Sequence, residues 1–177
     1  MAGGDHFYGW KNPGITVKFC SCLHLQEIYW KKEREDENMS ETSVNQRKVA
    51  MIGCGFVGSA TAFALMESGL FSEMVLIDAD KNRAEGEALD ISHGLPFARP
   101  MKIYAGDYDD IVDAAIIIVT AGANQKPDET RLDLVQKNVG IFKSIIPEIA
   151  KRNCGGILLI VSNPVDILTY TALKLSG

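Results

Sequence analysis

Residues 53–58 carry three glycines in the order Gly-Cys-Gly-Phe-Val-Gly, directly after the apolar run of residues 49–52. Between a strand and a helix, glycines at this spacing allow a tight turn, close approach of backbone to a pyrophosphate, and close packing of helix on strand. The N–H groups and partial positive charge at the helix start would then hold the phosphates. Gly53, Gly55 and Gly58 are therefore candidate phosphate-binding residues.

A carboxylate completes this pattern. Asp78 follows Gly58 by twenty residues and ends the apolar run of residues 74–77. An acid at this place accepts hydrogen bonds from the ribose hydroxyls of a dinucleotide, and its charge repels a 2′-phosphate. The sequence therefore predicts NAD, and not NADP, as the cofactor. The alternative is a glycine turn followed by an ordinary strand-end aspartate.

Two further polar segments follow apolar runs, at residues 121–131 and 162–166. The first is long and places Arg131 where the next helix is expected to begin. Helix N-termini favour acids over bases, so Arg131 is not there to complement the helix dipole. It is either a solvent-facing charge or part of a mobile lid that closes over a polar substrate.

From Arg47 onward, the sequence predicts strands that alternate with helices. The continuous apolar runs at 114–120 and 156–161 are typical of strands buried on both faces of a parallel sheet. Between them, apolar residues recur every three or four positions from Leu132 to Ile149, which predicts one helix packed on that sheet. The pattern predicts an α/β fold with a doubly wound parallel sheet, a Rossmann fold, in strand order 3-2-1-4-5.

Composition narrows the class of protein. The chain has 177 residues, 46% of them hydrophobic, and a formal charge of −5, which suits one domain with a substantial core. The acidic balance argues against nucleic acid as a partner. The apolar runs are shorter than a membrane span, and the four cysteines show no disulfide framework, which favours a cytoplasmic protein.

Residues 1–46 differ from the rest and are expected to form an irregular or disordered extension. Residues 31–37 are a solvated charge cluster, and Met39 resembles a natural start, so residues 1–38 could be leader sequence read as protein. An interaction role for this extension is the alternative. Cys20, Cys22 and His24 offer three metal ligands without a fourth, so we predict no metal site.

Residues 47–177 resemble the L-lactate/malate dehydrogenase family, and within it the bacterial lactate dehydrogenases. The resemblance rests on ordered motifs that agree in spacing and residue type: Gly-Cys-Gly-Phe-Val-Gly at 53–58, Val-Leu-Ile-Asp at 75–78, Asp-Ile-Ser-His-Gly at 90–94, Ala-Gly-Ala-Asn-Gln at 121–125, Arg-Leu-Asp-Leu-Val-Gln-Lys-Asn at 131–138, and Ser-Asn-Pro-Val-Asp-Ile-Leu-Thr-Tyr at 162–170.

The resemblance implies roles for four residues near the substrate. Arg131 would lie on the closing loop and polarise the pyruvate carbonyl. Gln125 would face the substrate side chain, where malate dehydrogenases have an arginine that pairs with a second carboxylate, so the neutral amide favours pyruvate and lactate. Asn163 would hydrogen-bond the substrate near the nicotinamide, with a cis bond to Pro164, and Asp166 belongs to the same segment.

The resemblance also implies further residues near the cofactor, beyond the three glycines and Asp78. They are Val57, Arg83, Tyr108, Gly122, Ala123, Ser144, Val161 and Asn163. Several have a plainer explanation, since Arg83 and Ser144 could be surface residues and Tyr108 could serve packing. Cys54 and His93 are not expected to act in catalysis, because Cys54 needs only to be small and His93 lies on a packing helix.

Two positions depart from the family pattern. Asp128 takes a place where related loops commonly have glycine, which would stiffen the lid. Asn124 takes a place where animal relatives have a cofactor-contacting arginine.

The family's acid–base histidine, its aspartate partner and the arginine that grips the substrate carboxylate are expected beyond residue 177. We therefore expect this chain to be a fragment truncated before the sixth strand and the substrate domain, inactive alone, with an exposed apolar edge at its fifth strand. The family also implies a homotetramer for a full-length form. A malate or other 2-hydroxy-acid dehydrogenase, and a non-catalytic NAD-binding module, remain as alternatives.

Overall fold

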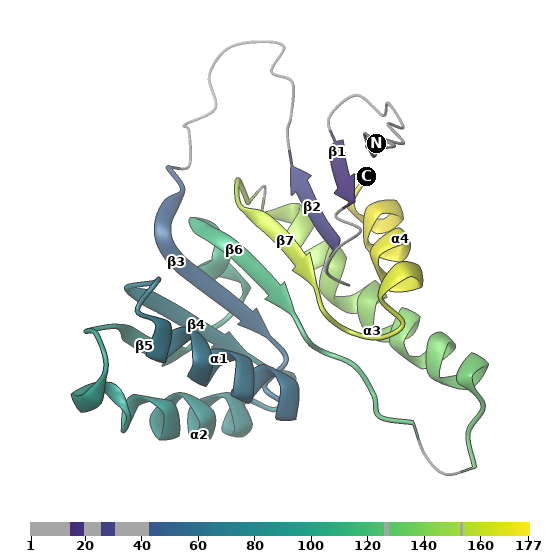
Figure 1. The fold of residues 1–177 in the computed structure, drawn as a ribbon. Coiled ribbons are helices and arrows are strands. Elements are labelled where there is room, and N and C mark those ends of the chain that lie inside the picture. The colour runs from purple at the N-terminus through teal and green to yellow at the C-terminus, as the bar shows by residue number, and fades with distance from the viewer. Residues whose placement is uncertain (1–14, 20–25, 31–42, 126–127, 153) are drawn as a thin grey trace, which may run out of the picture.

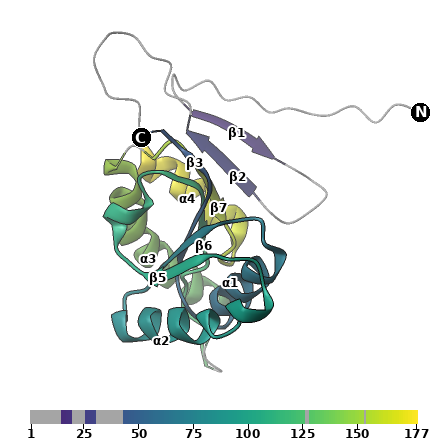
Figure 2. The ribbon, with the colours of Figure 1, turned by 90° about the vertical axis from the view of Figure 1, so that its left-hand side faces the viewer.

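The computed structural model describes residues 15–19, 26–30, 43–125, 128–152 and 154–177. Within them, one sheet with strand order β1-β2-β7-β6-β3-β4-β5 has helices on both faces (Figures 1 and 2). The strands are β1 Ile15–Phe19, β2 Gln26–Trp30, β3 Asn45–Ile52, β4 Glu73–Ile77, β5 Lys102–Ala105, β6 Ala114–Val119 and β7 Ile157–Ile160. The helices are α1 Phe56–Ser68, α2 Lys81–Ser92, α3 Arg131–Lys151 and α4 Val165–Ser176, with short 3₁₀ turns η1 Leu95–Phe97 and η2 Tyr108–Ile111.

Five of these strands are parallel and have the order that the sequence predicted. β3 lies between β4 and β6, with β5 outside β4 and β7 outside β6. The chain leaves β3 toward one side of the sheet and leaves β6 toward the other, so the strand order reverses between them. In open sheets of this kind ligands bind beyond the carboxyl ends of the strands at that reversal.

Alternating side chains of the strands build two cores, one on each face of the sheet. Ala50 and Ile52 of β3 join the core that α3 and α4 cover, while Val49 and Met51 join the core under α1 and α2 (Figure 1). Strands buried on both faces explain why the sequence runs are continuously apolar. Helix α1 ends at Gly69, whose φ of 64° is the left-handed conformation that favours glycine.

The expectation of an irregular region through residue 46 is wrong for three segments. β1 and β2 form an antiparallel hairpin, pairing Ile15 with Trp30 and Phe19 with Gln26, and β3 begins as early as Asn45. In β1, apolar Ile, Val and Phe alternate with Thr and Lys, a strand pattern that the surrounding composition obscured. Met39, the charge cluster at 31–37 and the Cys20, Cys22 and His24 group lie outside the described residues.

The free edge that we expected at the fifth parallel strand is also absent from the described sheet. β2 pairs antiparallel with β7, in a register that joins Gln26 to Ile160 and Tyr29 to Ile157. The physical reason is that an unpaired strand edge offers a row of N–H and C=O groups that another strand can satisfy. Here the hairpin satisfies them.

An ionic cluster closes the amino ends of the strands. The Nζ of Lys48 lies 2.7 Å from Oδ1 of Asp113 and 3.4 Å from Oε1 of Glu73, and the Lys48 side chain is only 7% exposed. Glu73 also accepts a hydrogen bond of 2.9 Å from the Tyr104 hydroxyl and pairs with Lys102 at 3.5 Å. We call these five residues the amino-edge cluster.

Candidate functional site: the carboxyl edge of the sheet

The glycine turn between β3 and α1 requires glycine at two positions for steric reasons. Gly53 has φ of 100°, and a Cβ there would lie 2.5 Å from the backbone nitrogen of Ala121. A Cβ at Gly58 would lie 1.9 Å from the carbonyl oxygen of Gly53. These residues therefore set the turn's shape and bring α1 against β3, as the sequence predicted.

Gly55 differs from its two neighbours in the motif. A Cβ added there would meet nothing within 4 Å, so the protein itself does not require glycine at this position. Gly55 is the N-cap of α1, which has neither a side-chain cap nor an acidic residue in its first turn, whereas Asp80 and Thr130 cap α2 and α3. Open space beside uncapped backbone donors fits a diphosphate.

Asp78 lies beside this turn at the end of β4, and its carboxylate is held by the backbone. Oδ2 accepts a hydrogen bond of 2.7 Å from the Cys54 N–H, and Oδ1 accepts one of 2.9 Å from the Asp80 N–H. A carboxylate has about four lone-pair sites, so capacity remains for ribose hydroxyls. The two parts of the NAD motif, far apart in sequence, therefore lie in direct contact.

The loop after β6 is tied to the glycine turn and to the loop after β7. The Thr120 hydroxyl donates to the Gly53 carbonyl at 2.7 Å, and the Ser162 hydroxyl donates to the Ala121 carbonyl at 2.7 Å. Gly122 and Ala123, which the sequence placed near the cofactor, follow directly. The loops after β3, β6 and β7 thus form one connected edge.

Asn138 is a buried member of this edge that the sequence reasoning did not single out. Its side-chain oxygen accepts from the Ala123 N–H at 2.7 Å, and its side-chain nitrogen donates to the Asn163 carbonyl at 2.8 Å. It stands last in the Arg-Leu-Asp-Leu-Val-Gln-Lys-Asn motif. A polar residue on the otherwise apolar face of α3 was the pattern that could have revealed it.

Arg131, predicted to belong to a lid, lies at the start of α3, and Gln125 lies in the segment before it. Arg131 is the first helical residue, and Thr130 and Asp133 form a capping box around it. Gln125 is exposed and donates from Nε2 to the Glu129 carbonyl at 2.7 Å, while Glu129 pairs with Lys137. Residues 126 and 127 of this segment lie outside the described residues.

Asn163, Asp166 and Val161 follow β7. The Val161 N–H donates to the Val119 carbonyl at 3.0 Å, which continues the pairing of β7 with β6 to the carboxyl edge. Asn163 is exposed and its bond to Pro164 is cis, as the family resemblance implied. Asp166 is exposed in the first turn of α4, where a negative charge complements the helix dipole.

Three further residues that the resemblance placed near the cofactor lie on helices α1, α2 and α3. Val57 and Arg83 are exposed in the first turns of α1 and α2. Ser144 is exposed on α3 and donates to the Ile141 carbonyl at 2.7 Å. Val57 and Arg83 thus belong to the carboxyl edge, whereas Ser144 lies well along α3.

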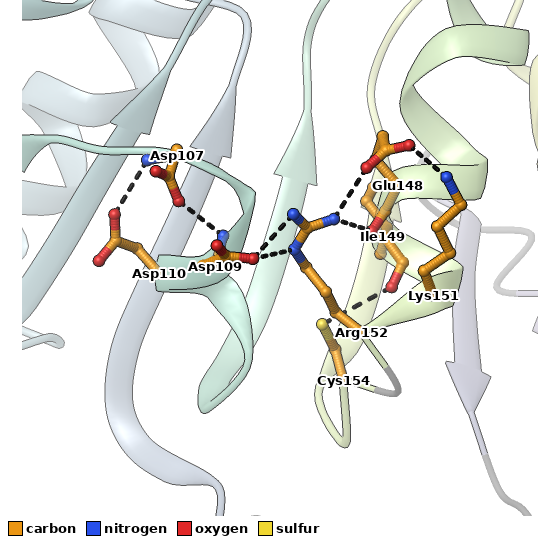
Figure 3. Close-up of polar contacts among 8 residues, drawn as sticks. All are labelled: Asp107, Asp109, Asp110, Glu148, Ile149, Lys151, Arg152 and Cys154. Atoms are coloured by element: carbon orange, nitrogen blue, oxygen red, sulfur yellow. Dashed lines mark hydrogen bonds and ion pairs between the residues drawn. The ribbon is translucent and has the colours of Figure 1, made fainter.

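Tyr108 packs away from the glycine turn. Its ring contacts the core under α3 and lies 5.5 Å from the Arg152 guanidinium, and burial raises its pKa. The Arg152 guanidinium lies 2.8 Å from Asp109 of η2 and 3.0 Å from Glu148 of α3, and so bridges the two elements (Figure 3). The packing interpretation of Tyr108 therefore has direct structural support.

The two residues that could have suggested other chemistry do not carry it. Burial, followed by the nearby Asp78 carboxylate, raises the pKa of the Cys54 thiol to about 12, so it stays protonated and is a poor nucleophile. His93 is exposed at the C-terminal end of α2. Because α2 runs back from the carboxyl edge, its end is remote from the site.

Three features lie together where the strand order reverses: the glycine turn, the carboxylate of Asp78 and the linked loops after β6 and β7. Together they define a dinucleotide-binding domain of the dehydrogenase type. Residues 47–177 match the family model described as lactate/malate dehydrogenase, NAD binding domain, and the chain belongs to this family. This assignment confirms NAD as the cofactor of the domain.

Individual relatives agree with the family. L-lactate dehydrogenase 1 of Clostridium acetobutylicum is 59% identical over 130 residues, covering 73% of this chain and 42% of the relative. L-lactate dehydrogenase of Thermoanaerobacterium saccharolyticum is 60% identical over 130 residues, with the same coverage of 73% and 42%.

Solved structures give the same result. MGS-M5, a lactate dehydrogenase enzyme from a Medee basin deep-sea metagenome library, superposes with a TM-score of 0.71 at 48% identity, covering 76% of this chain and 43% of that one. The chain thus spans less than half the length of these relatives.

Across the described residues, none of the helices has the length and apolarity to cross a membrane.

Proposed function

We propose that this chain supplies the cofactor-binding half of an NAD-dependent L-lactate dehydrogenase, which transfers a hydride reversibly between NADH and pyruvate. The observation that carries the proposal is the neutral Gln125 on the segment that leads to Arg131, within a domain about 59% identical to curated L-lactate dehydrogenases. The rival activity is that of a malate or other 2-hydroxy-acid dehydrogenase.

The carboxyl edge would hold the cofactor along its length. The uncapped start of α1 at Gly55 receives the diphosphate, and Asp78 accepts hydrogen bonds from the adenosine ribose. Ala123 and Asn163 border the nicotinamide. Bound NAD supplies the hydride chemistry, while these residues orient it and exclude other ligands.

Arg131 and Gln125 would select and activate the substrate. A guanidinium at the substrate carbonyl stabilises the negative charge that develops on its oxygen during hydride transfer. The Gln125 amide accommodates the methyl end of pyruvate but leaves the second carboxylate of oxaloacetate without a partner. Burying an unpaired charge in a closed site costs roughly several kcal/mol, and this cost disfavours oxaloacetate relative to pyruvate.

The described residues offer no suitable general acid–base beside Arg131. Hydride transfer to pyruvate needs a proton donor within hydrogen-bond reach of the carbonyl oxygen. His93 is the one histidine among the described residues, and it lies at the far end of α2. We therefore expect purified residues 1–177 to bind NADH without oxidising it in the presence of pyruvate.

A chimaera tests the proposed activity. Residues 47–177 would replace the matching segment of the Clostridium acetobutylicum relative, and pyruvate and oxaloacetate would be compared by kcat/KM. We expect a pyruvate-selective enzyme, with Gln125→Arg shifting the ratio toward oxaloacetate by about a hundredfold or more. The matched control is Gln136→Arg, an exposed position of α3.

Two results would contradict this proposal. A folded chimaera that binds NADH but prefers oxaloacetate would favour the malate alternative. A folded chimaera that binds NADH and reduces neither substrate would favour a non-catalytic NAD-binding module.

We further propose that the surface formed by α1 and η1 makes a contact between copies in a cytoplasmic homotetramer. Phe97 is 95% exposed and Phe63 is 45% exposed, and both border a hollow of about 290 Å³ together with Met66 and Gly94. Contiguous exposed aromatic residues mark interaction surfaces. Light scattering of the chimaera tests this, because Phe97→Glu should lower its mass to that of a smaller oligomer.

A further inference from the structure

Asn138 is a buried polar residue with no part in the roles described so far. It lies in α3 with 2% of its surface exposed, two helical turns after Arg131 and on the same face of the helix. Burying an amide is unfavourable unless its donors and acceptors are satisfied. A leucine of similar size would fill this place more simply, so the amide needs a reason.

The two hydrogen bonds of Asn138 join two separate loops. Its oxygen accepts from the Ala123 N–H of the loop after β6, at 2.7 Å, and its nitrogen donates to the Asn163 carbonyl of the loop after β7, at 2.8 Å. A Cβ at Gly122 would lie 3.5 Å from both of these side-chain atoms, so the backbone passes close to the amide. The side chain therefore links α3 to both loops.

This arrangement fixes the direction of the amide. Exchanging its oxygen and nitrogen would place NH₂ against the Ala123 N–H and a carbonyl oxygen against that of Asn163. Both contacts would be repulsive, so only one orientation is compatible with the two loops. Ser162, 7% exposed, supplies a second link between the same loops through the Ala121 carbonyl.

We propose that Asn138 is a positioning residue that holds Ala123 and Asn163 at the separation required by the nicotinamide half of NAD, and fixes this pair relative to α3 and Arg131. The inference rests on the proposed function for the place of the nicotinamide. It assigns a specific task to an amide that touches neither the glycine turn nor Asp78.

The first test separates the two halves of the cofactor. The whole chain is titrated calorimetrically with NAD and with ADP-ribose. Asn138→Leu should raise the Kd for NAD about tenfold, because the two hydrogen bonds that position Ala123 and Asn163 are lost. ADP-ribose contacts the glycine turn and Asp78, so its Kd should change by less than about twofold. Gln136→Leu, an exposed amide of α3, is the matched control.

The second test uses an isosteric variant whose behaviour depends on pH. In Asn138→Asp the buried carboxyl has a pKa above its ordinary value, because burial and the facing Asn163 carbonyl disfavour the charged form. Protonated, it can accept from Ala123 and donate to Asn163 as the amide does. Ionised, it repels Asn163, so the ratio of variant to wild-type Kd for NAD should approach one near pH 5 and rise to about tenfold near pH 8.

Equal losses for NAD and ADP-ribose, or no loss in either variant, would overturn the proposal. If Asn138→Leu does not fold, the pH dependence of Asn138→Asp decides alone. If the folded wild type binds neither ligand, the proposed function fails and this assignment fails with it. Hydrogen exchange of the Ala123 amide then shows whether the link itself exists, since Asn138→Leu should speed that exchange.

Discussion

The two ends of the same sheet are built from different interactions. At the amino ends of the strands, charged side chains pair with one another, and Lys48 is enclosed between Asp113 and Glu73. At the carboxyl ends, hydroxyl, amide and carboxylate side chains bond mainly to backbone groups of neighbouring loops, as Asp78 does with Cys54 and Asn138 with Ala123.

This difference separates stability from function within one domain. The amino-edge cluster satisfies its own charges, so it needs no ligand. The carboxyl edge fixes the positions of its loops but leaves the α1 start uncapped and Gly55 beside open space. Substitutions in the amino-edge cluster should therefore change the free energy of unfolding, and substitutions at the carboxyl edge should change the affinity for NAD.

Gly58 affects both stability and NAD binding, and its substitution should have a greater effect than any other proposed below. Gly58→Ala places a Cβ 1.9 Å from the Gly53 carbonyl oxygen, a backbone atom that cannot move without opening the turn. We expect the free energy of unfolding to fall by about 3 kcal/mol and NAD binding to be lost. Chemical denaturation and calorimetry measure the two effects.

Gly86→Ala is the matched control for this substitution. Gly86 lies inside α2, and a Cβ added there would meet nothing within 4 Å, so alanine should stabilise the helix by about 0.5–1 kcal/mol. A Gly58→Ala protein as stable as the wild type would contradict the close helix–strand contact.

The next effect should be confined to stability. Lys48→Met removes the buried cation and leaves Glu73 and Asp113 without it. Because these carboxylates are 21% and 42% exposed, solvent screening reduces the cost to about 2 kcal/mol. Denaturant unfolding should show this loss while the Kd for NAD stays unchanged at temperatures where the variant is folded.

Lys102→Met tests the same ion pair from its exposed side. Lys102 also contacts Glu73 but is 68% exposed, so its removal should change stability by less than about 0.5 kcal/mol. Similar losses for the two lysine variants would show that burial is not what makes Lys48 important.

Gly55→Ala should have the opposite profile. Gly55 has φ of −76°, which alanine adopts readily, and its Cβ would meet no protein atom within 4 Å. Stability should therefore stay within about 0.5 kcal/mol, while the methyl group intrudes on the diphosphate and raises the Kd for NAD by about tenfold or more. Gly140→Ala in α3, equally open, should leave the affinity unchanged.

The smallest effect is a pH dependence of the amino-edge cluster. Burial and the bond donated to Glu73 raise the pKa of Tyr104 to about 12. The neutral phenol therefore stabilises the folded state fully below about pH 10, and this stabilisation is lost as the pH rises toward 12. Tyr104→Phe should reduce this alkaline loss by about 1 kcal/mol, measured by unfolding at several pH values.

The acid side has the opposite sign. Burial would raise the pKa of Glu73, but its bonds to Tyr104 and the nearby lysines lower it overall. The stabilisation by ionised Glu73 is present above about pH 4.5 and is lost as pH falls through the lowered pKa.

The alkaline prediction has a clear contrary outcome. If the free energy of unfolding of wild type and of Tyr104→Phe falls equally at high pH, the bond from Tyr104 to Glu73 has no role in the alkaline loss.

The sequence was sufficient to predict the parallel sheet and the glycine turn that follows β3. Continuous apolar runs and the spacing of the glycines predict the strands and the turn, because these features depend on local residue type, and the strand order follows from the doubly wound class. Asp78 was predicted to contact a ribose, but its bond to the Cys54 N–H was not, since that bond joins residues 24 positions apart.

Other features depend on contacts that no local pattern encodes. The β1–β2 hairpin was missed because its pairing with β7 joins Gln26 to Ile160 across most of the chain. Asn138 was missed because one amide among apolar neighbours has no meaning until both loops are in place. Tyr108 and Ser144 remain predictions as cofactor contacts, and their observed partners are Arg152 and Ile141.

Titration of the purified chain with NAD and with NADP tests whether Asp78 and the glycine turn form an NAD site. Asp78, held at the end of β4 beside the glycine turn, predicts measurable NAD binding and NADP binding weaker by about a hundredfold, because a 2′-phosphate would meet the carboxylate. Equal affinity for the two, or no binding of NAD to the folded protein, would contradict it.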